Sequence, residues 1–217
     1  MKKFLVVLFA STVLAANASA QAFEAGGFGG VVRMSNGGAI GSTNTANPTD
    51  PTSLAKLQDK WMFGLRMTLN SWDHFGHEFT YAYHRTALQT TAPSTPAGQF
   101  TPAGPLVTSA TGTAIHTVTY GMLAYATAEG KRIRPFAQGG GGFSNFIYPG
   151  GSVSRGGGNT KLGIYYGGGI KVRLTEDGPF WIRADFRQHM TGMPYNLAGQ
   201  SGALRRNEIS VGVSYGL

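Results

Sequence analysis

Apolar and polar residues alternate over much of this chain, at the period of two that is typical of β-strands. The last ten residues, Glu208 to Leu217, alternate without a break. Successive side chains of a strand point to opposite faces, so this segment has one apolar and one polar face. The apolar positions of this predicted terminal strand are Ile209, Val211, Val213, Tyr215 and Leu217.

Seven further segments are predicted as strands, and no segment of comparable length keeps a helical period. The alternation is clearest in residues 60–71 and 161–174. Residues 22–34 and 133–146 are rich in glycine, and their two faces are weakly distinguished. In chain order, the eight predicted strands are residues 22–34, 60–71, 76–88, 114–127, 133–146, 161–174, 180–190 and 208–217.

The connections between these strands alternate in length. Short links are expected around residues 72–75, 128–132 and 175–179. Long links rich in Gly, Pro, Ser, Thr and Asn, residues typical of irregular loops, cover residues 35–59, 89–112, 147–160 and 191–203. This rhythm predicts an eight-stranded antiparallel up-and-down transmembrane β-barrel with short periplasmic turns and four long extracellular loops. Because lipid offers the backbone no hydrogen-bond partner, the terminal strand is expected to close the barrel on the first strand.

The N-terminus has the features of an export signal. Met1-Lys2-Lys3 is basic, and the apolar stretch Phe4 to Ala16 is too short for a permanent membrane helix. Ala18-Ser19-Ala20 supplies the small residues of a cleavage site, so Gln21 is the expected first mature residue. We therefore predict a signal peptide over residues 1–20 and a barrel domain over residues 21–217. The chain has no cysteine, so no disulfide is possible.

Ala18-Ser19-Ala20, the eight alternating segments and the ending Ile209-x-Val211-x-Val213-x-Tyr215-x-Leu217 together resemble the small outer-membrane β-barrel superfamily. This group includes the barrel domain of outer membrane protein A. The resemblance implies a location in the bacterial outer membrane, contact with its lipid, and recognition of the apolar terminal residues by the assembly machinery. Relatives usually end in an aromatic residue, whereas this chain ends in Leu217 with Tyr215 two positions earlier. We expect a monomer.

Charged residues on the polar faces of the predicted strands are expected to line the lumen. The interior of an eight-stranded barrel is filled mainly by side chains, and an isolated buried charge is costly. We therefore predict a plug of ion pairs and hydrogen bonds; a narrow charge-lined ion channel is the alternative. The predicted lumen residues are Arg66, Glu78, His84, Lys171, Arg173, Arg183, Asp185, Arg187, His189 and Glu208.

Catalytic and ligand-binding motifs are weak. Some barrels of this size modify lipid A with a His and a Ser, and His189 with Thr191 is the nearest match, but a threonine is a poor substitute for that serine. His74 and His77 lie near two carboxylates without a tetrahedral ligand set, so no metal is expected. The glycine runs lack the spacing of a nucleotide loop. We expect no catalytic residue and no cofactor.

A formal net charge of +8 could indicate nucleic-acid binding. The basic residues are dispersed rather than clustered, so no nucleic-acid partner is expected. The favoured function is that of a non-catalytic outer-membrane protein with an envelope-structural or surface-interaction role through its long loops. Three alternatives stay open: a narrow ion channel, a lipid A-modifying enzyme, and a soluble periplasmic ligand-binding barrel. The last would turn its apolar face inward.

Overall fold

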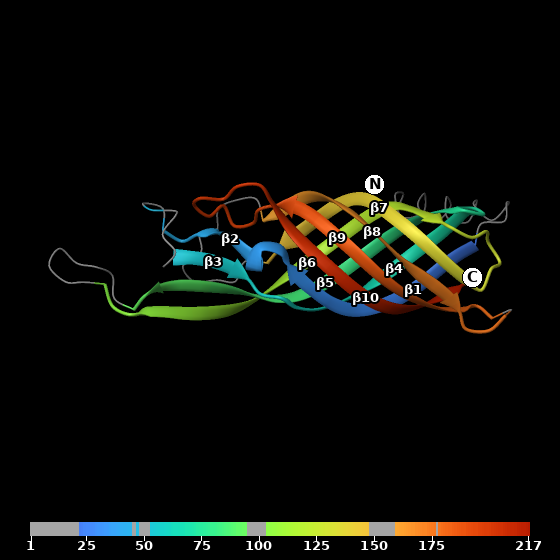
Figure 1. Ribbon diagram of the computed structural model, residues 1–217, viewed down its shortest axis with the longest axis horizontal. Coiled ribbons are helices and arrows are strands. Elements are labelled where there is room, and N and C mark those ends of the chain that lie inside the picture. Colours follow the sequence, from blue (N-terminus) through green and yellow to red (C-terminus); the bar gives the residue numbers. More distant parts are fainter. Residues whose placement is uncertain (1–21, 45–46, 48–52, 95–102, 148–158, 177) are drawn as a thin grey trace, which may run out of the picture.

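The computed structural model describes residues 22–44, 47, 53–94, 103–147, 159–176 and 178–217. The predicted signal peptide, with Ala18, Ala20 and Gln21, lies outside these residues. Within them, eight long strands close into an antiparallel barrel, which confirms the predicted fold (Figure 1). They are β1 (Ala22–Met34), β4 (Lys60–Trp72), β5 (Phe75–Pro93), β6 (Leu106–Tyr125), β7 (Ile133–Phe146), β8 (Thr160–Arg173), β9 (Phe180–Gly192) and β10 (Ala203–Gly216).

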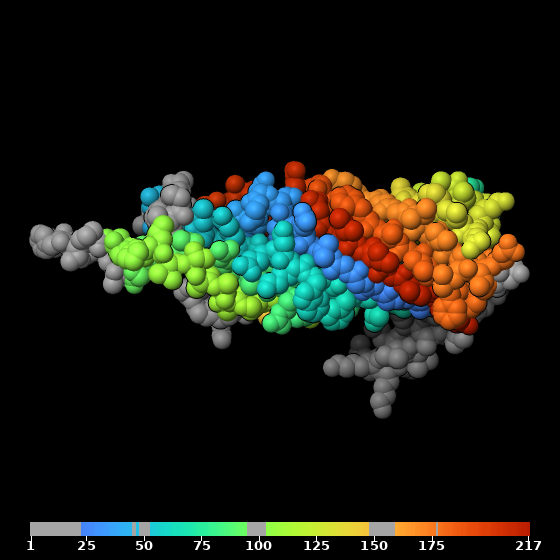
Figure 2. Space-filling model, turned by 60° about the horizontal axis from the view of Figure 1, so that its bottom comes forward, coloured from blue at the N-terminus to red at the C-terminus, as the bar shows by residue number. Residues whose placement is uncertain are grey.

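The barrel closes between its first and last strands. β1 pairs with β4 on one side and with β10 on the other, in registers that place Gly29 opposite Phe63 and Val211. In Figure 2 the blue band of β1 accordingly lies between the bands of β4 and β10. The prediction that the terminal strand pairs with the first is therefore confirmed. No helix in the described ranges is long and apolar enough to cross a membrane.

The apolar faces of the strands point outward. Along β10, Ile209, Val211 and Val213 are more than half exposed, whereas Glu208 and Ser210 are buried. A soluble barrel would show the opposite arrangement, so that alternative is wrong. The exposed apolar surface instead matches the band that faces lipid in a transmembrane barrel.

Aromatic residues mark the two borders of this apolar band. On β4, Trp61 and Trp72 are 48% and 65% exposed and lie eleven positions apart. At about 3.3 Å per residue and a strand tilt of about 40°, they are separated by roughly 28 Å along the barrel axis. This height matches the hydrocarbon layer of a bilayer.

Two of the predicted long loops contain regular structure, which corrects the sequence interpretation. β5 and β6 extend as paired strands to Pro93 and Leu106, well into the predicted loop 89–112. The segment 35–59 contains the 3₁₀ turn η2 (Ser35–Gly38) and the strands β2 (Ala39–Ser42) and β3 (Leu54–Leu57). β10 also begins at Ala203, five residues before the predicted start. The sheet thus continues beyond the barrel at the end that carries the long connections, here called the long-loop end (Figure 1).

Glycines in the strands make room for neighbouring backbone and for aromatic side chains. A Cβ on Gly140 would meet the carbonyl of Tyr120 on the adjacent strand. A Cβ on Gly121 would meet the carbonyl of Gly139 and the hydroxyl of Tyr165, whose side chain is buried in the lumen. These glycines therefore serve barrel curvature and packing.

Candidate functional site

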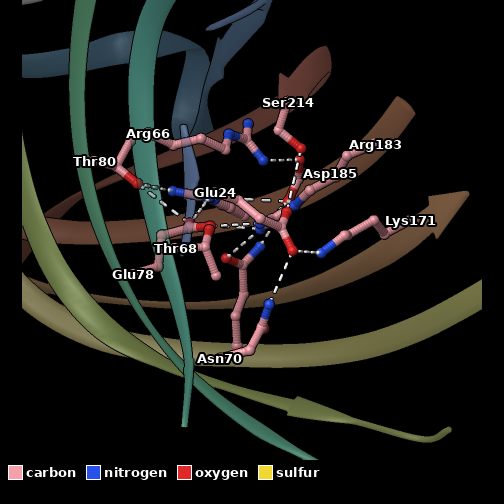
Figure 3. Close-up of polar contacts among 12 residues, drawn as sticks. Glu24, Arg66, Thr68, Asn70, Glu78, Thr80, Lys171, Arg183, Asp185 and Ser214 are labelled. Atoms are coloured by element: carbon pink, nitrogen blue, oxygen red, sulfur yellow. Dashed lines mark hydrogen bonds and ion pairs between the residues drawn. The ribbon is translucent and has the colours of Figure 1, made fainter. Parts of the chain in front are cut away.

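A cluster of charged side chains fills the middle of the barrel (Figure 3). Glu78 on β5 forms ion pairs with Arg183 and with Arg187, the latter at 2.5 Å, both from β9. Asp185 lies 2.7 Å from Arg66 of β4 and also accepts a 2.8 Å hydrogen bond from Nε of Arg183. All five side chains are buried. We call these five residues the central cluster; three cations in it face two carboxylates.

Neutral groups complete the coordination of the central cluster. Thr68 and Thr80 donate to Glu78 at 3.1 and 3.2 Å. Gln138 donates to Asp185 at 3.1 Å and accepts from Arg183 at 3.2 Å. The guanidinium of Arg183 also lies 4.2 Å from the centre of the Phe136 ring. Such hydrogen bonds and cation–π contacts compensate for the water that the charges lose on burial.

A second group lies nearer the short turns, where Glu24 of β1 pairs with Lys171 of β8. Asn70 and Ser214 donate to the Glu24 carboxylate at 2.9 and 3.3 Å. Four strands meet at this one carboxylate, as Figure 3 shows. Glu24 therefore ties β1, β4, β8 and β10 together across the lumen.

A third group lies on the long-loop side of the central cluster. Glu208 of β10 lies 3.1 Å from His189 of β9 and 3.7 Å from His84 of β5. Tyr165 stacks on His189 with ring centroids 5.3 Å apart. Next to them, the guanidinium of Arg206 donates to Ser144 at 2.8 Å. All these side chains are buried.

Beyond the histidines, an apolar cap closes the long-loop end of the lumen. It combines strand residues with residues of the long connections, which fold over the barrel mouth. The hydroxyl of Tyr195 donates to the carbonyl of Ile147 at 2.9 Å, and burial raises the pKa of this hydroxyl. The cap consists of Val32, Met34, Ile40, Ala55, Leu57, Leu88, Ile115, Phe146, Tyr195 and Leu204, all buried.

The interior leaves little free space. Two cavities lie among the side chains around His189, one beside Arg187 and Glu208 and one beside Thr117 and Ser144. Each measures about 10 Å³, roughly the space of one water molecule. Within the described part of the chain, the lumen is therefore packed from the central cluster to the cap.

Nine of the ten predicted lumen residues are buried inside the barrel and contact one another or their neighbours as described above. Arg173 is the exception. It lies half-buried at the short-turn end, where its guanidinium donates to the carbonyl of Glu176 at 3.0 Å and lies 4.6 Å from the Trp181 ring. It belongs to the rim of the barrel rather than to the lumen clusters.

Sequence reasoning missed three buried charges: Glu24, Arg134 and Arg206. Glu24 and Arg134 lie on β1 and β7, where glycine weakened the distinction between the two faces. Arg206 lies two positions before Glu208, on the part of β10 between the predicted loop 191–203 and the predicted terminal strand. Extending the alternation of the terminal strand by one repeat would have found it.

The structure does not bring together the residues that the sequence offered for lipid A chemistry or for metal binding. His189 and Thr191 share the inward face of β9, but the Thr191 hydroxyl has no hydrogen-bond partner, and the acidic neighbour of His189 is Glu208. His77 bonds to the outward-facing hydroxyl of Tyr120, whereas Glu78 points into the lumen. Among the described residues, no three acidic or histidine side chains are grouped so that they could hold a metal ion.

A closed barrel with an apolar outside, aromatic borders and a filled polar interior defines a β-barrel protein of the bacterial outer membrane. The chain belongs to the outer membrane protein beta-barrel domain family, whose family model matches residues 6–216.

Solved structures of outer-membrane proteins share the fold. OprG from Pseudomonas aeruginosa superposes with a TM-score of 0.54 at 13% identity, over 91% of this chain and 95% of that chain. AlkL, determined by solid-state NMR in lipid bilayers, superposes with a TM-score of 0.56 at 13% identity, over 91% and 90% of the two chains. At this identity the likeness concerns the fold alone. No curated protein sequence matches the chain.

Proposed function

We propose that this chain is a non-catalytic outer-membrane protein whose long-loop end is a surface for interaction with a partner outside the cell. The observation that carries the proposal is the sheet that projects beyond the barrel. Its strands are β2, β3 and the outer parts of β5 and β6 (Figure 1). A rigid scaffold that presents such an extension is the usual setting for recognition.

The projecting ribbon is long and regular. β4 begins at Lys60 and β7 ends at Phe146, but β5 and β6 continue as eight residue pairs from Thr86–Thr113 to Pro93–Leu106. At about 3.3 Å per residue, the ribbon extends roughly 26 Å past its barrel neighbours. Cross-strand hydrogen bonds between hydroxyl groups, such as the 3.0 Å bond between Thr90 and Ser109, support it.

One edge of this ribbon is available for pairing. β3 pairs with β5 from Leu88 to Thr90, but no strand in the described residues pairs with β6 between Leu106 and Thr113. The bond from Ser94 N to Pro105 O and that from Ile147 N to Ala114 O fix the orientation of the backbone. In an antiparallel pair, hydrogen-bonded residues alternate along the strand, so the N–H and C=O groups of the even-numbered residues from Leu106 to Gly112 point away from β5. A partner strand would add at such an edge.

The composition of the ribbon favours the addition of a partner strand at this edge. No Asp, Glu, Lys or Arg occurs between Arg85 and Glu129, so the edge lacks the charges that commonly block strand addition. Leu106 and Val107 are each more than half exposed. The packed lumen supports an interaction role over the second interpretation, a narrow ion channel.

The test compares cells that display the intact protein with cells that display a variant in which a short Gly-Ser link replaces residues 89–111. Attachment to a panel of immobilised extracellular proteins and polysaccharides is measured, and the heat-dependent gel mobility of both barrels is checked. The proposal expects attachment that is lost with the ribbon. Equal attachment of both proteins, or none by either, would refute it.

A further inference from the structure

The outer wall of the barrel carries a small polar patch at the border of its apolar band. Arg33 on β1 lies directly opposite Asn207 on β10, and both side chains point outward. Asn207 is in turn opposite Gln188 on β9. Arg205, two positions before Asn207 on β10, also points outward. Diagonal neighbours on paired strands lie about 7–8 Å apart, so the two arginines flank the same spot.

The free side-chain groups of Arg33, Arg205 and Asn207 are hydrogen-bond donors. Gln188 Nε2 donates to Oδ1 of Asn207 at 2.7 Å, and Gln188 itself contacts the Tyr166 hydroxyl. The side-chain oxygen of Asn207 accepts this bond, and its NH₂ group has no hydrogen-bond partner among the described residues. In the described part of the chain, neither arginine side chain has a hydrogen-bond or ion-pair partner. Two guanidinium groups and one amide NH₂ form a set suited to an oxyanion.

The position of the patch decides what kind of anion it meets. The next outward row toward the short-turn end consists of Phe186, Ile209, Val31 and Trp61, each more than 45% exposed and within the lipid-facing band. Beyond the patch, at the long-loop end, lie the loops. The donors therefore lie where the hydrocarbon layer ends and headgroups begin, on the wall where β10 meets β1 (Figure 2).

The accessible charges around the long-loop end are mostly positive, like those of the two arginines in the patch. The exposed or half-buried basic side chains here are Arg33, Lys56, Lys60, Arg85, Lys161 and Arg205, and the described acidic residue among them is Asp59. At the short-turn end, Lys131, Arg132 and Arg173 are balanced by Asp73, Glu129 and Glu176. An anionic ligand is thus favoured at the long-loop end and not at the other.

We propose that Arg33, Arg205 and Asn207 bind the phosphate group of a lipid headgroup in the membrane leaflet that surrounds the long-loop end. Guanidinium forks match phosphate oxygens in pairs, and a phosphate between the two arginines removes their mutual repulsion. The adjacent exposed apolar row accommodates the acyl chains of the same lipid. A free phosphate ion would lack this second contact, so the site is assigned to a lipid.

Native mass spectrometry of the protein released from detergent tests the proposal, with dioleoyl phosphatidic acid as the probe and dioleoyl phosphatidylcholine as the lipid control. The double variant R33Q/R205Q is expected to bind phosphatidic acid about tenfold more weakly, because it loses charge-assisted hydrogen bonds to the phosphate. Its affinity for phosphatidylcholine should change little. R85Q removes a cation from the same end and is the matched control, expected to bind nearly as the wild type does.

Two results would overturn the proposal: unchanged affinity of R33Q/R205Q, or an equal loss in R85Q, which would reduce the effect to overall charge. If inorganic phosphate competes as strongly as the lipid, the assignment to a lipid fails. Heat-dependent gel mobility verifies that each variant is folded. If R33Q/R205Q does not fold, R33K/R205K keeps the charge but loses the forks, and it must also bind phosphatidic acid more weakly.

Discussion

Replacing Glu78 with Gln tests how far the central cluster stabilises the barrel. Glu78 is buried and accepts from Arg183, Arg187, Thr68 and Thr80. In the wild type, three guanidinium groups face two carboxylates, so removing this carboxylate leaves three cations around Asp185. An amide fills the same volume but cannot balance the charge. Breaking a buried ion pair by removing one partner costs about 3–5 kcal/mol, and we expect a loss in this range.

The assay is reversible urea unfolding of the barrel in lipid vesicles, followed by tryptophan fluorescence and by gel mobility without heating. Glu129→Gln is the control, because Glu129 lies in a short turn and makes no ion pair in the described structure. Its substitution should change the free energy of unfolding by less than about 0.5 kcal/mol. Adding Arg187→Gln to Glu78→Gln should restore part of the loss, since it removes one of the two cations that Asp185 leaves unbalanced.

The reasoning would be refuted if Glu78→Gln destabilised the folded barrel by less than about 1 kcal/mol, or no more than the control does. The cluster would then fill space without stabilising the fold. A loss that the second substitution deepens instead of relieves would also contradict the charge argument.

Three further perturbations probe the cap, the lipid face and the lumen. Phe146→Ala should cost about 3–5 kcal/mol in the same urea titration, because Phe146 is fully buried in the cap; a cost below about 1 kcal/mol would mean that the cap is not tightly packed. Val211→Arg on the lipid face should cost about 2–4 kcal/mol, whereas Ala203→Arg at the exposed start of the same strand should cost little; equal costs would place lipid elsewhere. The wild-type protein in planar bilayers should give no steady single-channel currents, since the lumen is packed; currents that vanish on replacing Arg183 with Gln would establish the channel instead.

Alternation let the sequence determine which side chains face the lumen. Wherever large apolar and charged residues alternate, as on β9 and β10, the buried and exposed sets follow directly from the period of two. Where glycine replaces much of one set, as on β1 and β7, the faces could not be distinguished from sequence. Glu24 and Arg134 were missed although both are buried.

The projecting ribbon was missed for a different reason. Its Thr, Ser, Ala, Gly and Pro residues have the composition of a loop, and no apolar face required burial. Pairing of β5 with β6 decides its structure, because each strand satisfies the backbone groups of the other all the way to Pro93 and Leu106. Composition alone carries no information about such a partner.

The strands, their two faces and most of the lumen charges could be predicted from the sequence, because they follow from the local period of the backbone. The closing role of the terminal strand could be predicted too, because every strand must be paired in lipid. Tertiary structure alone decided which charges meet: Glu78 with Arg183 and Arg187, and His189 with Glu208. It also decided that loop residues such as Tyr195 seal the mouth, and that Arg33 and Arg205 flank one spot on the wall. These contacts depend on the register between strands, which is fixed only when the whole barrel closes.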